Sequence, residues 1–374
     1  MDVTWPPLLS GADADAARAA IGTIADDLAA RTFDDGSLAH GAAGAALLHG
    51  TLARAGFEGE DARAHAALAR SLELLDAGSP GPSLGTGLVG TAWVMHQLRD
   101  VVDCDADTLA RIYDVVSELL AQASGALDCD LWAGLIGYGV FALERGRIDL
   151  VERVVAQLVA RAEPAAGGAA WRRRDRPGRA PDGYIDLGMA HGVAGVVAFL
   201  AAAMAAGVNA ARAPAAAGAR WLAMQDRGGA APRFAMAIGI EIDPQNVCDG
   251  WCYGDLAIAA TLQRAGAALG DGDAIARARD LAATAAGAAI DHVPHYDAGL
   301  CHGAASRAFG LAHLARVLGD DRLGDAARRY ARAAIEMSKR ETRSSLLVGT
   351  SGIALALLAT LSAEDLGWAR LFLY

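Results

Sequence analysis

The sequence predicts an all-α protein, an (α/α)7 toroid of seven inner and seven outer helices, in one domain spanning residues 1–374. Three observations predict this fold. Alanine, the strongest helix former, makes up about a quarter of the chain, whereas the residues that favour strands are sparse. A glycine motif followed by an apolar run recurs seven times. A charged, amphipathic stretch comes before the first motif and between each motif and the next.

The seven motifs have the form Gly-x-x-(Gly/Ala/Ser) and continue as apolar runs of helical length. We expect these inner helices to be buried, because they are apolar nearly all round. We also expect the small residues at positions i and i+3 to let neighbouring helices approach closely, since they share one helix face. The first glycines of the motifs are Gly41, Gly87, Gly134, Gly192, Gly254, Gly303 and Gly349.

The amphipathic stretches predict the outer helices. In one of them Ile112, Val115, Val116 and Leu119 recur at helical spacing, which indicates one buried and one solvent-facing side. The expected outer helices cover residues 13–31, 61–77, 105–123, 149–163, 210–225, 273–291 and 321–339.

Composition excludes several classes of protein. The formal net charge of −11 predicts no nucleic-acid partner and no anionic-lipid surface. The most apolar run, at residues 193–208, is shorter than the ~20 residues of a membrane span, and we interpret it as a buried core helix. The acidic start of the chain and its Pro6-Pro7 pair do not resemble a secretion signal. With an odd number of cysteines, five, these features predict a protein of the reducing cytoplasm.

In a toroid of this kind the N-termini of the inner helices face one rim. Residues directly before the motif glycines are therefore expected around one opening, and any chemistry is expected there. They are His40, Thr86, the loop 130–133, His191, the pair 252–253, the pair 301–302 and Val348.

Two neighbouring repeats carry a possible zinc site. Cys252, Cys301 and His302 would offer two sulfurs and one nitrogen, a set that suits zinc. Three protein ligands leave the fourth tetrahedral position open, as in catalytic sites. The alternative is that both cysteines are small residues of the core.

Two further residues at the predicted rim are candidates for proton transfer. His191 could exchange protons near neutral pH, or its ring could simply form a hydrogen bond at a helix start. Asp130 could cap a helix, or its carboxylate could orient or exchange a proton with the site. For His40, at the equivalent place in the first repeat, we favour the structural interpretation.

The motifs Asp-Leu-Trp-Ala-Gly at 130–134, His-Gly at 191–192, Trp-Cys-Tyr-Gly at 251–254 and Cys-His-Gly at 301–303 resemble those of the lanthionine synthetase C-like family. The resemblance spans nearly the whole chain. It implies an α/α toroid with one zinc ion bound by Cys252, Cys301 and His302. It also implies that His191 and Asp130 are the acid and base candidates.

Two departures from the family pattern stand out. Family cyclases often have an arginine four residues before the cysteine of Trp-Cys-Tyr-Gly, and here that place holds Cys248. Either Arg233 or another residue substitutes for that arginine, or its role is absent, or the activity differs. Cys248 itself could be a spare metal ligand, but we favour a plain loop cysteine. The early repeats also leave no room for the subdomain that some members carry.

The resemblance implies a cyclase that forms lanthionine or methyllanthionine rings. A cysteine thiol of a peptide adds to dehydroalanine or dehydrobutyrine of the same peptide. Zinc lowers the pKa of the bound thiol, and His191, supported by Asp130, would protonate the α-carbon. The expected partners are a dehydrated precursor peptide and a separate dehydratase, because no such portion precedes the repeats. We expect the protein in the cytoplasm, alone or at the periphery of a membrane-associated biosynthetic complex.

A basic stretch begins at Trp171 and contains Arg172, Arg173 and Arg174. These arginines could bind an acidic segment of the precursor peptide, or they could belong to a solvated surface loop.

Other functions remain to be weighed against cyclisation. A family member could bind zinc and glutathione or another thiol, or act as a scaffold, without cyclase activity. Helical toroids also include glycoside hydrolases, which need a pair of carboxylates. Only Asp130 and Asp255 are expected near the opening. Terpene cyclases need clustered aspartates, and the acidic pairs of this chain fall away from the predicted rim.

Overall fold

The computed structural model describes residues 6–78, 81–104, 106–122, 127–175, 178, 180–290, 292–293, 296–363 and 367–374. Three parts of the sequence prediction lie outside these ranges: the acidic start at residues 1–3, the ends at 105, 123 and 291 of two expected outer helices, and Arg176, Pro177 and Arg179 of the basic stretch. Within the described ranges the chain forms fourteen α-helices and two small two-stranded sheets. The predicted all-α class is confirmed.

The apolar runs form the expected inner helices, each beginning at the residue after a motif glycine. They are α2 (Ala42–Arg54), α4 (Leu88–Gln97), α6 (Leu135–Glu144), α8 (Val193–Ala205), α10 (Asp255–Leu269), α12 (Ala304–Leu318) and α14 (Thr350–Leu361). The run at 193–208 is a core helix as expected, since most side chains of α8 are buried. The helix ends where Gly207 takes a φ of +95°, a common way to terminate a helix.

The amphipathic stretches form the expected outer helices. They are α1 (Gly11–Ala29), α3 (Glu60–Ala77), α5 (Ala106–Gln122), α7 (Ile148–Arg161), α9 (Arg212–Ala223), α11 (Gly272–Gly287) and α13 (Asp321–Ser338). In α7 the buried residues Leu150, Val151, Val154 and Leu158 follow the helical period and leave the opposite side in solvent. Asp271 and Asp320 cap α11 and α13 by accepting hydrogen bonds from backbone amides.

The motif glycines do not serve the approach of neighbouring helices, and that expectation is wrong. They make room for the loop that precedes their own helix. A Cβ atom on Gly192 would lie 2.1 Å from the carbonyl oxygen of Asp186, and one on Gly195 would lie 2.2 Å from that of Met189. Any side chain would therefore push the loop off the helix. Comparable clashes with preceding loops recur at Gly41, Gly87, Gly134, Gly303 and Gly349.

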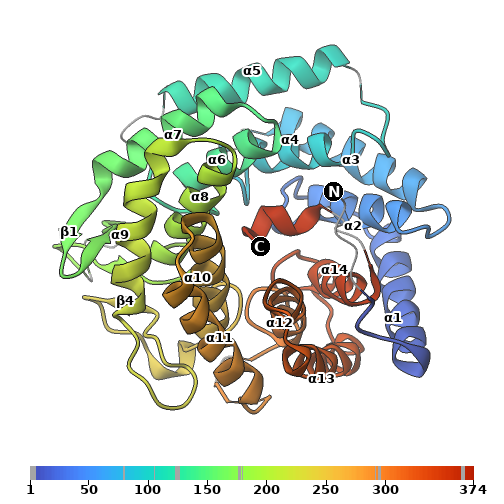
Figure 1. The fold of residues 1–374 in the computed structure, drawn as a ribbon. Coiled ribbons are helices and arrows are strands. Elements are labelled where there is room, and N and C mark those ends of the chain that lie inside the picture. The colour runs from blue at the N-terminus through green and yellow to red at the C-terminus, as the bar shows by residue number, and fades with distance from the viewer. Residues whose placement is uncertain are drawn as a thin grey trace. The chain divides into compact units, whose positions relative to one another are not determined.

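Residues 1–119 and 297–372 form one compact unit. Within it α2 packs against α3, α4 and α14, and α12 packs against α13 and α14 (Figure 1). The loops before these inner helices are joined by backbone hydrogen bonds. Ala39 N donates to Gly85 O at 2.8 Å, and Leu346 N donates to Ala39 O at 2.9 Å. Cys301 N donates to Leu347 O at 2.7 Å, so the four loops form one row.

Residues 120–296 and 373–374 form a second compact unit. Here α8 packs against α6, α9 and α10, and α10 packs against α11 (Figure 1). The loops before the inner helices again form a row, because Leu131 N donates to Ala190 O at 3.1 Å and Met189 N donates to Cys252 O at 2.9 Å. The single-domain assignment of residues 1–374 stays a prediction.

The sequence did not predict the small sheets, which lie in the two longest repeats. Strand β1 (Glu163–Ala165) pairs antiparallel with β2 (Gly168–Ala170), and β3 (Ile185–Asp186) pairs antiparallel with β4 (Ala237–Ile238). Short 3-10 helices cover Asn209–Ala211, Pro244–Asn246 and Trp368–Phe372. Across the described ranges, no helix combines the length and the apolar character that crossing a membrane requires.

Candidate functional site

His191 lies at the end of the loop that precedes α8. The loop is held by its own backbone: Gly192 N donates to Gly188 O at 3.0 Å, and Asp186 Oδ1 accepts from Gly188 N at 2.8 Å. The other oxygen of Asp186 accepts a hydrogen bond from the Tyr253 hydroxyl at 2.7 Å. These contacts fix the backbone under the imidazole, whose side chain keeps 39% of its surface exposed. The ring is therefore both anchored and accessible.

Asp130 serves both of the roles that the sequence left open, with one oxygen for each. Its Oδ1 accepts hydrogen bonds from Trp132 N and Ala133 N, both at 2.7 Å, which shapes the turn into α6. Its Oδ2 lies 2.7 Å from Nδ1 of His191. The carboxylate is only 2% exposed, so the pair is shielded from water on the aspartate side. Because Nδ1 faces the carboxylate, Nε2 is the ring atom left for a reacting group.

Arg173 completes a buried charge network around this pair. Its Nη1 donates to Asp130 Oδ2 at 2.6 Å and to the carbonyl oxygen of His191 at 2.8 Å. Its Nη2 donates to Asp175 at 2.8 Å. The guanidinium thus ties the loop before α8 to the carboxylate that orients the imidazole. An arginine suits this task because its planar fork has several donors.

The network shifts the pKa values of both members of the pair. Burial raises the pKa of Asp130, but the hydrogen bond and charge of His191, together with the Ala133 amide and Arg173, bring it down to about 2. Burial lowers the pKa of His191, but the hydrogen bond and charge of Asp130 outweigh burial and raise it above 6.5. The pair therefore favours an ionised Asp130 carboxylate and shifts the His191 imidazole toward its protonated form.

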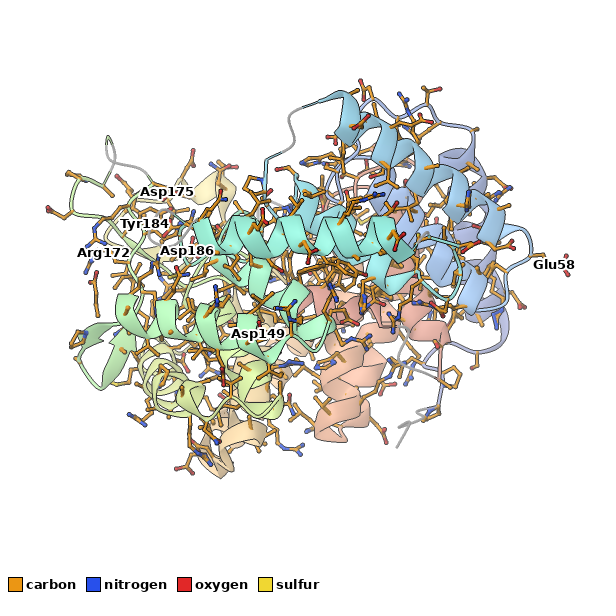
Figure 2. All side chains as sticks on the ribbon, turned by 90° about the horizontal axis from the view of Figure 1, so that it is seen from above. Glu58, Asp149, Arg172, Asp175, Tyr184 and Asp186 are labelled. Carbon is orange, nitrogen blue, oxygen red and sulfur yellow. The ribbon has the colours of Figure 1, made fainter. Side chains whose placement is uncertain are left out.

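The other arginines of the basic stretch contact different groups. Arg172 Nε donates to Glu163 at 2.9 Å, and Arg174 Nη2 donates to the same carboxylate at 3.3 Å. Figure 2 shows Arg172, with Asp175, Tyr184 and Asp186, on the side of the molecule formed by the segment between α7 and α8. Arg172 and Arg174 also line a cavity of about 610 Å³ that Glu163 shares. Their role in binding substrate stays a prediction.

Cys252 lies next to the pair in the row of loops, in the loop that precedes α10. It is 4% exposed, and its Sγ lies 3.8 Å from Sγ of Cys248, which is 5% exposed. Between them, Asp249 is fully buried and lies 2.7 Å from Nε2 of His292. The loop is thus held by the contact of Asp249 with His292 and by the hydrogen bond from Met189 N to Cys252 O.

Cys301 and His302 lie in the loop before α12, in the other unit. The backbone of Cys301 is fixed at its amide by Leu347 and at its carbonyl oxygen by the Ser306 hydroxyl, at 3.2 Å. Nε2 of His302 lies 3.7 Å from Asp297, a carboxylate of its own loop. Both candidate ligands therefore sit on an anchored backbone.

The donor set fits zinc. Cys248 and Cys252 are both buried and offer two sulfurs, and His302 of the other unit is also buried and offers a nitrogen. Cys301, the remaining predicted ligand, is partly buried. Zinc prefers thiolate and imidazole ligands, whereas magnesium and calcium prefer oxygen ligands.

Arg233 is held by a different part of the molecule. Its guanidinium contacts Asp226 and donates to Asp280 at 2.6 Å. Its backbone amide donates to Asp255 at 2.7 Å. Burial and the charge of Asp249 raise the pKa of Asp255 to about 6. The arginine that contacts the Asp130–His191 pair is Arg173.

Sequence reasoning missed the aspartates that support the loops. Asp35, Asp128, Asp186 and Asp297 each stand six residues before a motif glycine. Each accepts a hydrogen bond from a backbone amide of its own loop. Their regular spacing is a signal in the sequence that would have identified them.

A family model described as lanthionine synthetase C-like protein matches residues 32–373. Among solved structures, nisin cyclase is similar, with a TM-score of 0.79 and 17% sequence identity over 95% of this chain and 96% of that chain. None of the curated proteins matches this sequence. The structural match confirms the predicted (α/α)7 toroid as the fold class. Since the family model covers most of its length, the chain belongs to the lanthionine synthetase C-like family.

Proposed function

We propose that the protein is a zinc-dependent lanthipeptide cyclase. It adds a cysteine thiol of a dehydrated peptide to dehydroalanine or dehydrobutyrine of the same peptide and forms a thioether ring. The observation that carries the proposal is the anchored pair of Asp130 and His191, next to Cys252 in the row of loops, in a chain of this family. The name of the structural relative, nisin cyclase, supports the same activity.

The metal would be one zinc ion, and Cys252, Cys301 and His302 would hold it. When bound, zinc supplies a substrate thiolate near neutral pH, because coordination lowers the pKa of a thiol. The chain keeps the ligands in place through backbone contacts, since the Cys252 carbonyl oxygen and the Cys301 amide both bond to neighbouring loops.

His191 would act as the acid of the reaction. When sulfur adds to the β-carbon of a dehydro residue, the α-carbon must gain a proton. Nε2 of His191 delivers it, because Nδ1 faces Asp130. The raised pKa of His191 favours the protonated ring, and the low pKa of Asp130 keeps its carboxylate ionised near neutral pH. Asp130 and Arg173 act as positioning residues for the ring.

The substrate would be a dehydrated precursor peptide, and a separate dehydratase would supply it. Arg172 and Arg174, in the cavity lined by the end of α7 and by Glu163, would contact an acidic segment of that peptide. The alternative function, in a zinc-containing thiol-binding or scaffold member, would use the same ligands for binding without ring formation.

Mass spectrometry after thiol alkylation tests the proposal. A dehydrated precursor peptide is incubated with the full chain, and each new ring is expected to remove one alkylatable thiol without changing the mass of the unalkylated peptide. Removal of zinc by a chelator should stop the reaction, and added zinc should restore it. If thiols disappear no faster than without the protein, the proposed activity is wrong. Binding of the peptide without ring formation would favour the alternative.

A further inference from the structure

We propose that Cys248 is a further ligand of the zinc ion, so that four groups of this chain bind the metal instead of three. The proposal rests on the proposed function for the zinc site itself. What is new is that Cys248 also binds the metal, at the place where family cyclases often carry an arginine.

The first observation is the distance between two sulfurs. Sγ of Cys248 lies 3.8 Å from Sγ of Cys252. Two sulfurs that each lie about 2.3 Å from one zinc ion, at the tetrahedral angle, are about 3.8 Å apart. A disulfide would need about 2.0 Å, and the structure has none at these cysteines. The separation therefore suits two ligands of one ion.

The second observation is that both sulfurs are fixed and buried. Cys248 and Cys252 are 5% and 4% exposed. Asp249, between them, is held by His292, and Gly250 N donates to Tyr253 O at 2.8 Å across the turn. Thiol pairs on such a constrained backbone need little reorganisation to bind a metal.

The third observation is that this loop departs from the pattern of the other repeats. At Gly254 the φ angle is +90°, whereas the other motif glycines have extended φ angles such as −126° at Gly41. The atom nearest to a Cβ on Gly254 belongs to the Asp249 side chain, at 2.2 Å, whereas at the other motif glycines it is a backbone atom of the preceding loop. A non-glycine residue would be strained at this φ. Cys248, directly before Asp249, thus lies in the one motif loop among the described residues that uses a left-handed glycine.

The consequence concerns the number of protein ligands. Three ligands leave one tetrahedral position for a substrate thiol, whereas a fourth thiolate from Cys248 would occupy it. The resting site would then be closed, and the thiol of Cys248 would compete with the peptide for the metal.

Metal binding to purified full-length variants tests the proposal without reference to activity. The test variant is Cys248→Ser. Cys252→Ser and His302→Ala each remove a ligand of the proposed zinc site and serve for comparison. Cys129→Ser is the matched control, because Cys129 is also a buried cysteine of the same unit, 6% exposed, outside the motif loop of α10. Zinc affinity is measured by competition with a chromogenic chelator. The sulfur-to-metal absorption band is measured after cobalt replaces zinc.

For Cys248→Ser we expect zinc affinity to fall by at least about tenfold. Loss of a residue that only hydrogen-bonds to a ligand usually costs this much, and loss of a ligand should cost no less. The cobalt band should fall by about one third, from three thiolates to two. Cys129→Ser should match the unmodified chain in both measurements. Unchanged affinity and an unchanged band in Cys248→Ser, with losses in Cys252→Ser and His302→Ala, would overturn only the role of Cys248. Unchanged metal binding in all of these variants would overturn the proposed zinc site as well.

Discussion

The loops before α2 and α8 share a backbone arrangement and differ in what they present. Gly41 N donates to Ser37 O, and Gly192 N donates to Gly188 O, each at 3.0 Å. Each loop ends in a histidine. His40 is exposed, whereas the His191 ring contacts Asp130. The repeat therefore supplies a common frame, and neighbouring segments decide what the residue at its end contacts.

The segments around the two loops account for this difference. The repeat that ends at Gly192 is 58 residues long, against 46 for the one that runs from Gly41 to Gly87. Its extra length carries β1, β2 and the arginine that contacts both Asp130 and the loop of His191. The arginine contact that distinguishes the loop before α8 therefore comes from the longer repeat.

The strongest test of the comparison is to remove each histidine. His191→Ala should slow ring formation by roughly 100- to 10,000-fold, because the proton donor is lost. His40→Ala should leave the rate within about twofold, since that ring has no such partner. Rates are measured by thiol alkylation of a dehydrated peptide. A wild-type rate and stereochemistry for His191→Ala would refute its role as the acid.

The shared frame can be tested with the glycines. Gly41→Ala and Gly192→Ala should each lower the free energy of unfolding by about 3 kcal/mol, because the new Cβ would collide with a loop carbonyl oxygen. Gly22→Ala on α1, where a Cβ meets no atom within 4 Å, should be neutral or slightly stabilising. Urea unfolding gives the values. A loss at only one of the two motif glycines would show that the loops are not equivalent.

The charge pair of Asp130 and His191 predicts a pH dependence of stability. The pKa of Asp130 falls from 3.8 to about 2 on folding. Its ionised form therefore adds about 2 kcal/mol to the free energy of unfolding above pH 4, and this stabilisation is lost as the pH falls through 2. The pKa of His191 is raised, so its contribution is complete below 6.5 and is lost as the pH rises through the folded-state value. The stabilisation by the pair should be greatest between about pH 4 and 6.5.

Urea unfolding of the unmodified chain and of Asp130→Asn checks this window. The difference in unfolding free energy between the two proteins should shrink by about half between pH 5 and pH 3. Asp35→Asn, in the loop before α2, serves as the control for loss of a loop carboxylate. A constant difference across this range would contradict the low pKa of Asp130.

Arg173 offers a finer test, because it distinguishes positioning from catalysis. Arg173→Gln should lower kcat by about tenfold with little change in KM, as the ring loses its fixed orientation. The negative charge of Asp130 raises the pKa of His191, and the positive charge of Arg173 lowers it. Removal of the Arg173 charge should therefore raise the pKa of His191 further. An NMR titration of His191 measures this shift. Arg172→Gln is the matched control, since Arg172 contacts Glu163, and an equal effect there would refute the specific role.

The smallest effect is expected for the arginines at the cavity. Arg172→Ala and Arg174→Ala should each weaken binding of the precursor peptide by about two- to fivefold at low salt, the range of partly exposed charge pairs. Arg18→Ala on α1 is the control. Binding is measured by calorimetry or fluorescence anisotropy, and unchanged affinity would favour a solvated surface loop.

The helices could be predicted because their signals are local. The apolar run after Gly192 and the amphipathic period of α7 each lie within about four turns of chain, and the glycine repeat aligns them. The motifs also identified His191 and Asp130, which the structure brings into contact across 61 residues of sequence.

The remaining features depend on contacts that the sequence pattern does not carry. Arg173 reaches Asp130 across 43 residues, and nothing in the basic stretch distinguishes it from Arg172 or Arg174. The glycines were interpreted as helix contacts because spacing alone cannot tell which atoms face a missing side chain. The proximity of Cys248 to Cys252 depends on the turn between them, which an i, i+4 spacing does not determine.

The row of backbone hydrogen bonds between neighbouring loops has a consequence for evolution and engineering. The bonds involve main-chain atoms, so the side chain directly before each motif glycine is free to change while the frame stays in place. Thr86 and Val348 occupy the same position as His191 in their own repeats. They are natural sites at which a new acid, base or ligand could be introduced with little cost to folding.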